Sequence, residues 1–345
     1  MYLICFGTRP ELIKVFPIID EFKKNKIPFK TIFTGQHKDL IKNYTNLIEQ
    51  PDYYLNNVME HDQSLNLLIS KMISKADKVL NKDDFNVIVQ GDSSTSFAMA
   101  LASFNNQKSI IHIEAGLRTK NLRSPYPEEA NRVMISQIAD IHFCPTNLSK
   151  TNLQNEGIKK NVFVVGNTVV DSYQKILANM KFSQTTLDLV KDNPEYILVT
   201  LHRRENRDTN FNVVWEQLNK IHMKIIYIKH PSVKNSSEHL NENIIQIDPV
   251  SYEDMIYLIE NSKGIISDSG GLQEEAVCAK KKILICRDTT ERPETIETGY
   301  GKLIGNDILN SIDFFKNSSS VQNTANPYGQ NVSKKIVNIL QKIFK

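Results

Sequence analysis

The sequence has few cysteines, no long apolar run and little net charge, and each absence excludes a class of protein. Only four of its 345 residues are cysteines, and they form neither a Cys-x-x-Cys pair nor a His-Cys set with metal-ligand spacing. A disulfide framework and a metal site are therefore not expected, and the cysteines suit a reducing cytosol. No stretch reaches the roughly 18 apolar residues of a membrane span, and the start lacks a basic secretory signal. The sequence predicts a soluble, cytoplasmic protein that does not bind a membrane.

The charge pattern gives no sign of nucleic-acid binding. The net charge is +3, and the lysines are scattered along the chain. This distribution offers no basic groove for a phosphate backbone. The sequence also has no G-x-G-x-x-G after its first apolar segment and no G-x-x-x-x-G-K-[ST]. We therefore expect no dinucleotide cofactor and no P-loop chemistry.

Length and periodicity predict an α/β fold with two Rossmann-like, doubly wound domains. The chain exceeds one core of ordinary size, and short apolar segments alternate with longer amphipathic ones, as in parallel sheets covered by helices. In the first half we expect strands at 2–6, 29–34, 85–90, 109–113, 141–143 and 162–165, and helices at 11–24, 38–49, 63–80, 95–104, 126–138, 147–155 and 168–180. In the second half we expect strands at 196–200, 224–229, 244–247, 264–267 and 282–286, and helices near 210–221, 252–260 and 271–279.

The domain boundaries follow from breaks in this rhythm. We predict a first domain at 1–180, a second at 195–328 and a terminal helix at 329–345 with one apolar face. Residues 181–194 gain polar and turn residues, which favours a linker. Two such domains would face a central cleft, and open α/β sheets bind ligands outside the carboxyl ends of their strands.

Two glycine-containing turns each join a buried strand to a helix. The helix that opens at Ser269-Gly270-Gly271 offers free backbone N–H groups and a positive dipole end to an anion. The turn Gly7-Thr8-Arg9-Pro10-Glu11 adds a guanidinium that suits phosphate oxygens. Lys14, one turn later, either supports Arg9 or is solvated. We expect both turns to bind one phosphate-bearing ligand.

Three carboxylates are candidates for acid–base chemistry. Asp92 and Glu114 each follow a buried strand, and Glu128 lies in Pro125-Tyr126-Pro127-Glu128-Glu129. A carboxylate just beyond such a strand can be partly desolvated and act as a general acid or base. Either of the first two, taken alone, could equally cap the segment that follows it. All three together, with phosphate-binding turns, favour catalysis.

Further polar residues follow the strands of the second half. His202 could bind a diphosphate and protonate a leaving group, or be an ordinary loop histidine. Glu275 could accept both hydroxyls of a ribose, whereas we expect its neighbour Glu274 to be solvated. The dense polar segment from Arg287 to Glu294, which contains Arg292, favours a hydrogen-bonded substrate loop.

A series of motifs occurs in a recognisable order along the chain. The series is Gly7-Thr8-Arg9-Pro10-Glu11, Gly35-Gln36-His37, Gly91-Asp92, Glu114-Ala115-Gly116-Leu117-Arg118, Pro127-Glu128-Glu129-Ala130-Asn131-Arg132, Gly166-Asn167-Thr168, His202-Arg203-Arg204-Glu205, Ser267-Asp268-Ser269-Gly270-Gly271-Leu272-Gln273-Glu274-Glu275 and Arg287-Asp288-Thr289-Thr290-Glu291-Arg292-Pro293-Glu294. Together these motifs resemble the bacterial UDP-N-acetylglucosamine 2-epimerases, especially the non-hydrolysing branch. The match extends from residue 2 to about residue 305.

The resemblance implies a fold, a reaction and a set of site residues. The fold is the glycosyltransferase-B type with the terminal helix crossing back onto the first domain, usually in a homodimer. The reaction interconverts UDP-GlcNAc and UDP-ManNAc without a cofactor, here for surface polysaccharide synthesis. The implied catalytic residues are Asp92, Glu114, Glu128 and His202. The expected substrate and UDP contacts are Arg9, Lys14, Arg132, Ser269, Gly270, Gly271, Glu275 and Arg292.

Three alternatives stay open from the sequence. The first is a hydrolysing epimerase that releases ManNAc and UDP, or a 2-epimerase of a related UDP-diacetamido sugar. The second is a glycosyltransferase of the same architecture, which would need an acceptor. The third is a nucleotide-sugar sensor without activity, against which the three carboxylates argue.

Overall fold

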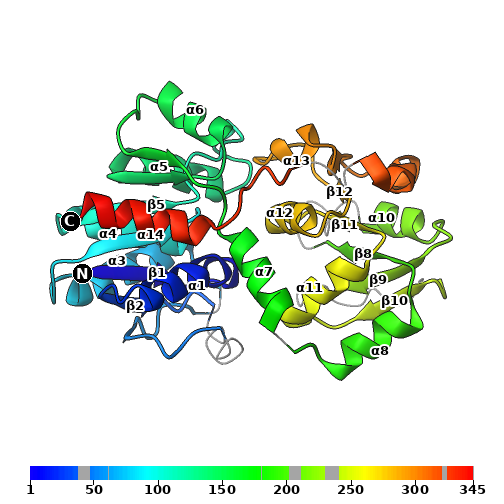
Figure 1. The fold of residues 1–345 in the computed structure, drawn as a ribbon, viewed down its shortest axis with the longest axis horizontal. Coiled ribbons are helices and arrows are strands. Elements are labelled where there is room, and N and C mark those ends of the chain that lie inside the picture. Colours follow the sequence, from blue (N-terminus) through cyan, green and yellow to red (C-terminus); the bar gives the residue numbers. More distant parts are fainter. Residues whose placement is uncertain are drawn as a thin grey trace. The chain divides into compact units, whose positions relative to one another are not determined.

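The chain forms two α/β units, each built on one parallel sheet (Figure 1). The computed structural model describes residues 1–37, 47–60, 62–179, 181–201, 211–229, 241–320 and 325–344. The first unit comprises Met1–Ser172 and Tyr328–Lys345, and the second comprises Tyr173–Pro327. The predicted fold class is confirmed, because both sheets are parallel and alternate with helices along the chain.

The first unit contains a seven-stranded sheet in the order β3-β2-β1-β4-β5-β6-β7, with every neighbouring pair parallel. The strands are β1 (Tyr2–Phe6), β2 (Phe29–Phe33), β3 (Tyr53–Tyr54), β4 (Asn86–Gln90), β5 (Ser109–Ile113), β6 (Ile141–Cys144) and β7 (Val162–Val164). The chain builds outward from β1 to β3 and then returns to β4 on the other side of β1. The strand order thus reverses between β1 and β4, and such a switch point is where doubly wound sheets bind ligands.

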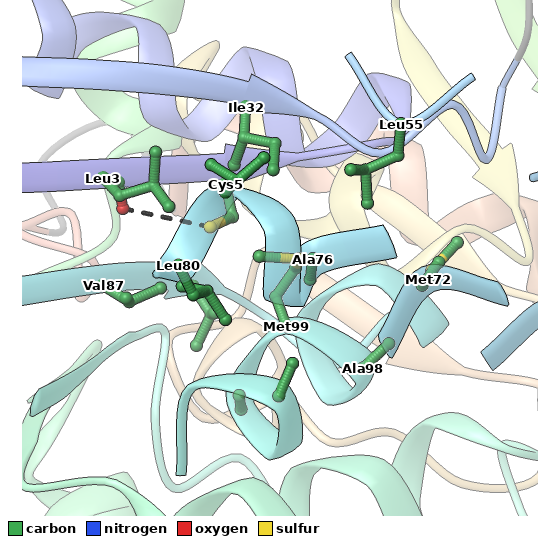
Figure 2. Packing of buried hydrophobic residues seen from close by; sticks show 14 of the residues in the cluster. Leu3, Cys5, Ile32, Leu55, Met72, Ala76, Leu80, Val87, Ala98 and Met99 are labelled. Carbon is green, nitrogen blue, oxygen red and sulfur yellow. Dashed lines mark hydrogen bonds between the residues drawn. The ribbon is translucent and has the colours of Figure 1, made fainter. Parts of the chain in front are cut away.

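Apolar side chains from the sheet and two helices form the core on one face of this sheet. The described helices of the unit are α1 (Arg9–Lys24), α3 (Leu65–Leu80), α4 (Ser94–Asn105), α5 (Glu128–Ile138), α6 (Asn147–Asn155) and α14 (Val332–Ile343), together with the start of α7 (Val169–Asn179), which continues into the second unit. Figure 2 shows Leu3 and Cys5 of β1 packed with Met72 of α3 and Met99 of α4. The strands are buried on both sides, which accounts for their continuous apolar runs.

The last helix belongs to the first unit although the second unit precedes it in sequence. One face of α14 is fully buried through Val332, Ile336, Val337 and Leu340, and the helix packs against α1. Its amino end is capped by Asp171, whose carboxylate accepts hydrogen bonds from the Val332 and Ser333 amides at 3.1 and 2.7 Å. The apolar face thus finds its partner in a helix more than 300 residues earlier.

The second unit contains a six-stranded sheet in the order β10-β9-β8-β11-β12-β13, again with parallel pairs. The strands are β8 (Tyr196–Thr200), β9 (Lys224–Ile228), β10 (Ile244–Ile247), β11 (Gly264–Ser267), β12 (Ile283–Ile285) and β13 (Gly301–Leu303). The helices are α8 (Gln184–Asp192), α10 (Phe211–Leu218), α11 (Tyr252–Asn261), α12 (Gly270–Cys278), α13 (Glu294–Glu297) and the 3-10 segment η2 (Leu309–Ser320). The strand order of this sheet reverses between β8 and β11, so the switch point lies between these two strands. Helix α12 follows β11 and therefore begins next to the switch point.

The structure differs from the sequence predictions mainly in short or polar elements. The segment 181–194, expected as a linker, carries α8, because Ser183 caps the helix by accepting from the Thr186 amide while Val190 is buried. The chain passes between units at Ser172–Tyr173, inside α7. Strands β3 and β13, of two and three residues, were not expected. Most of the helix expected at 38–49 lies outside the described residues. Within the described ranges, no helix has the length and apolar character needed to cross a membrane.

Candidate active site

Glu114 lies at the end of β5 with its carboxylate buried among three donors. Lys14 of α1 contacts Oε1 at 2.5 Å, the Asn167 amide donates to the same oxygen at 3.0 Å, and the Gln90 amide donates to Oε2. The side chains of Lys14 and Glu114 are 7% and 6% exposed. A buried cation and two amide donors favour the ionised carboxylate. Lys14, predicted as a substrate contact, is thus in direct contact with a predicted catalytic residue.

The backbone of Glu114 is strained. Its φ of +66° lies in the left-handed region, which costs a residue with a Cβ about 1–2 kcal/mol. The hydrogen bonds from Asn167 and Gln90 hold the side chain in this geometry. Strain maintained by surrounding contacts is a feature of functional sites.

Asp92 follows β4 through Gly91, whose φ of +70° turns the chain sharply. Its Oδ2 accepts from Nε of Arg132 at 3.0 Å and from Nη2 of the same guanidinium. The Asn131 amide also donates to the Asp92 main-chain oxygen at 2.8 Å. The Asp92 side chain is still 27% exposed. Arg132, predicted to lie near the site, therefore orients Asp92 and leaves part of its carboxylate open to solvent.

Glu128 is the first residue of α5 and is half-buried. It stands one turn before Arg132, so the two side chains project from the same side of the helix. The adjacent Glu129 is fully buried, and its carboxylate accepts from Nη1 of Arg132 at 3.0 Å. Helix α5 therefore carries Glu128 on the same side as the arginine that contacts Asp92.

Arg9 is an exposed residue at the start of α1, in the turn that follows β1. Its amide donates to Nδ1 of His37 at 3.3 Å, and the His37 amide donates to the Gly7 carbonyl at 2.8 Å. A neutral His37 that accepts at Nδ1 carries its proton on Nε2. Arg9 therefore lies at the amino terminus of α1, where the free backbone N–H groups and the guanidinium both favour binding of a phosphate.

In the second unit, α12 begins at Gly270 after Ser269, as the sequence predicted. The Ser269 amide donates to the Ser267 hydroxyl at 3.0 Å, and this hydroxyl also contacts the Thr200 hydroxyl at 2.8 Å. Among the residues that the structure describes, none has an atom within 4 Å of a Cβ placed at Gly271. The amino terminus of α12 therefore has open space at its second residue. This geometry suits an anion at the helix end.

Glu275 is buried within α12, and its carboxylate accepts from the Tyr252 hydroxyl at 2.9 Å. Burial raises the pKa of Tyr252 well above its usual value, and the negative charge of Glu275 acts in the same direction. Tyr252 therefore stays protonated and can only donate to Glu275. The bond fixes the orientation of the predicted ribose-binding carboxylate.

Arg292 is held in a buried ion-pair cluster. Its Nε lies 3.0 Å from Glu274, and its Nη1 contacts Glu291, which also pairs with Arg287 at 2.8 Å. The prediction that Glu274 is solvated is wrong, because its side chain is fully buried against this arginine. Arg292, expected as a UDP contact, supports the first turn of α12. His202 lies outside the described residues.

Comparison with known proteins gives the same interpretation. A family model described as UDP-N-acetylglucosamine 2-epimerase matches residues 20–341. The chain belongs to the UDP-N-acetylglucosamine 2-epimerase family. A 2-epimerase of this name from Campylobacter jejuni is 40% identical over 372 residues, covering 99% of this chain and 97% of the relative.

Solved 2-epimerase structures share the fold along their full length. The UDP-GlcNAc 2-epimerase from Neisseria meningitidis, solved with UDP-GlcNAc bound, is 39% identical, has a TM-score of 0.90 and covers 99% of both chains. The enzyme from Methanocaldococcus jannaschii, in complex with UDP-GlcNAc and UDP, is 34% identical with a TM-score of 0.87, covering 99% of this chain and 100% of that one. The fold and the family therefore agree.

Several residues of the candidate site of this 2-epimerase were not assigned a role from sequence. Glu11, Gln90, Glu129 and Asn167 each contact a predicted site residue or the turn that carries one. Gln90 had a usable signal, since it is a polar residue at the end of an apolar strand. Glu11, Glu129 and Asn167 lie inside the recognised motifs, but their partners are distant in sequence.

Proposed function

We propose that this 2-epimerase interconverts UDP-GlcNAc and UDP-ManNAc by eliminating UDP and adding it back. The observation that carries the proposal is the set of carboxylates in the first unit, in which Glu114 and Asp92 are each paired with a cation. A protein that only bound the nucleotide sugar would have no use for two oriented carboxylates at the ends of neighbouring strands.

The chemistry explains why more than one carboxylate is needed. The C2 proton of a hexose is not next to a carbonyl, so its removal is best coupled to loss of UDP from C1. One carboxylate takes the proton from C2 as the C1–O bond breaks, giving UDP and a glycal. Protonation of C2 on the opposite face and return of UDP to C1 complete the inversion. A base on one face and an acid on the other are thus required.

The structure supports a division of roles among the candidate groups. Asp92 is partly exposed and oriented by Arg132, so it is our candidate for direct proton transfer. Glu114 is deeper and pairs with Lys14, which suits a group that stays ionised. Glu128 on α5 is our candidate for the opposite face. In the second unit, Ser269, Gly270 and Gly271 at the α12 terminus are our candidates for binding the diphosphate, and Glu275 is our candidate for the ribose. In the first unit, Arg9 is our candidate for a phosphate contact.

Proton NMR of the purified protein with UDP-GlcNAc in D2O tests this proposal. We expect UDP-ManNAc to appear and deuterium to enter C2 of both sugars. An Asp92→Asn variant should lower the rate by roughly 100- to 10,000-fold, the range for removing an acid–base group. Free ManNAc would instead select the hydrolysing reaction. If no deuterium enters UDP-GlcNAc and no new sugar forms, UDP-GlcNAc is not the substrate. The next substrates to test would be UDP-diacetamido sugars, and after them a transferase assay with acceptors.

The same proposal includes the setting of the enzyme. We expect a cytoplasmic homodimer that supplies UDP-ManNAc for surface polysaccharide. The four cysteines are thiols and not disulfides, which is compatible with a reducing compartment. Light scattering after size exclusion would determine the oligomeric state.

A further inference from the structure

Glu11 is a buried carboxylate with an unusual number of hydrogen-bond donors. It lies in the first turn of α1 and is 2% exposed. Its Oε2 accepts from the Gly7 amide at 2.9 Å, the Thr8 amide at 2.8 Å and the Thr8 hydroxyl at 2.9 Å. Its Oε1 accepts from the Ser93 hydroxyl at 2.5 Å and lies 2.8 Å from the Ser96 hydroxyl, whose proton is shared between Oε1 and the Gln90 main-chain oxygen. Both oxygens are therefore occupied by protein, which leaves neither for substrate.

A helix cap explains only half of this arrangement. Thr8 and Glu11 form a capping box at the amino end of α1, and this box accounts for the contacts of Oε2. The contacts of Oε1 come from Ser93, in the turn after β4, and from Ser96, in the first turn of α4, both more than 80 residues later. A Glu that served only as a cap would not need these two hydroxyls.

The two turns joined by Glu11 are those at the switch point of the first sheet. The turn after β1 carries Arg9, and the turn after β4 carries Asp92, directly followed by Ser93. Strands β1 and β4 are parallel neighbours, so both turns leave the same edge of the sheet. The Gly7 turn is also packed closely, since a Cβ at Gly7 would lie 2.0 Å from Oγ1 of Thr34 and 2.3 Å from Oγ1 of Thr95. Glu11 thus fixes the Asp92 turn to a turn that has no room to shift.

Resting on the proposed function, we propose that Glu11 is a positioning residue that sets Asp92 against Arg9, and thereby the base against the phosphate group. Misplacement of a reacting group by about 1 Å can cost on the order of 100-fold in rate. Glu11 acts through Ser93 and Ser96 and does not touch the sugar. Arg132 and Asn131 hold Asp92 from α5, and Glu11 supplies the connection to the Arg9 turn.

The energetics of Glu11 support a functional role. Burial raises the pKa of Glu11 above its usual range, although the hydrogen bonds from Ser93, Ser96, Gly7 and Thr8 oppose this. An acid whose folded pKa is raised loses stabilisation as it ionises, so the charged carboxylate is unfavourable for stability at neutral pH. A glutamine could keep the main-chain contacts without that charge. A carboxylate that is unfavourable for stability is common where function requires it.

The test compares Glu11→Gln, Ser96→Ala and their double variant in the full-length enzyme. We expect Glu11→Gln to fold with a Tm near that of the wild type and to lower kcat by about 10- to 100-fold with little change in KM. Ser96→Ala removes one donor at a helical position where alanine is favourable, and should lower kcat by at least about threefold. Glu11→Gln can place an NH2 donor where Oε1 accepts from the two serines, and Ser96→Ala removes one of those serines. Because both changes alter the same connection, the double variant should be no slower than Glu11→Gln alone.

Asp171→Asn is the matched control, because Asp171 is also a buried carboxylate that caps a helix of the first unit. It should lower Tm and leave kcat per folded molecule unchanged. The proposal assumes that the wild-type enzyme turns over UDP-GlcNAc. It is overturned if Glu11→Gln and Ser96→Ala both keep the wild-type kcat, or if they change only KM. Failure of the wild type to turn over UDP-GlcNAc would contradict the proposed function instead. If Glu11→Gln fails to fold, the kcat of Ser96→Ala decides.

Discussion

Glu114 and Asp92 end neighbouring strands, yet their surroundings differ. Glu114 is buried against Lys14, whereas Asp92 faces Arg132 with about a quarter of its side chain exposed. Under the proposed function, the exposure of Asp92 suits proton transfer, and the contact of Glu114 with Lys14 suits electrostatic support. A pair of carboxylates with different environments is how an enzyme separates the roles of proton transfer and electrostatic support.

His112 links β5 to the turn that carries Asp92 and should make the first unit sensitive to acid. Its Nε2 lies 2.8 Å from the Gly91 carbonyl, which can only accept, so the neutral ring donates from Nε2. Burial lowers the pKa of His112 to about 3. An unfolded histidine takes up a proton near pH 6.5, so stability is present above that pH and falls as the pH drops towards 3.

We expect this histidine to account for about 2 kcal/mol of lost stability between pH 7 and pH 5, at about 1.4 kcal/mol per unit below 6.5. A His112→Gln variant keeps an amide donor and should lose less stability over this range than the wild type. The measurement is native-state hydrogen exchange of the β4 and β5 amides at both pH values. Exposed His222, changed to Gln, is the control. Equal pH dependence in wild type and His112→Gln would contradict the assignment.

Helix α1 concentrates three functions in its first two turns. Arg9 is exposed at its amino end, Glu11 joins two turns and Lys14 reaches Glu114. Glu11 and Lys14 are three residues apart and thus lie on one side of the helix, towards the turns after β4 and β5. Both are polar, and both are buried because their partners come from those turns.

Substitutions at two neighbouring glycines of α12 can test stability and ligand binding separately. A Cβ at Gly270 would lie 2.8 Å from the ion pair of Arg292 and Glu291, whereas a Cβ at Gly271 would meet open space. We expect Gly270→Ala to destabilise the second unit by about 1–3 kcal/mol through overpacking. Gly271→Ala should stay within about 0.5 kcal/mol of the wild type but raise the KM for UDP-GlcNAc, because its methyl group enters the proposed phosphate site.

Thermal unfolding and steady-state kinetics of the two glycine variants check this expectation. Each variant serves as the reference for the other, since they differ by one position in the same turn. A normal KM in Gly271→Ala would show that the ligand does not approach this end of α12. Unchanged stability in Gly270→Ala would show that the Arg292 ion pair is able to move aside.

The two units are not two consecutive halves of the chain, because α14 belongs to the first unit but follows the second unit in sequence. Ile336 is fully buried on the face of α14 that packs against the first unit. Ile336→Ala should therefore destabilise the first unit by about 2–5 kcal/mol. The exposed Asn338, two residues later, gives the control Asn338→Ala, which should change stability by no more than about 0.5 kcal/mol.

Hydrogen exchange resolved by segment is the appropriate measurement for this change. Amides of β1 and β4 should exchange faster in Ile336→Ala, whereas those of β8 and β11 should exchange as in the wild type. Uniform acceleration in both units would show that they unfold together. The result would also show whether the carboxyl-terminal helix is needed to keep Asp92 and Glu114 in place.

Local sequence predicted most of the fold, because strands and helices are encoded by residues close to one another. The strand expectations at 2–6, 109–113 and 196–200 match the structure, since each is a short, largely apolar segment. The pattern failed for β3 and β13, which are too short to show periodicity. It also failed for α8, where a polar composition concealed a capped amphipathic helix.

For the candidate site, the sequence by itself determined which chemical groups stand at the strand ends. Only the tertiary structure decided their partners. Lys14 and Glu114 are 100 residues apart, and Asp92 and Arg132 are 40 apart, so no local pattern encodes either pair. The same reason explains why Arg292 proved to be held by Glu274, and why Glu11 joins two turns. Such pairs form only when parallel strands bring their carboxyl ends to one edge of a sheet.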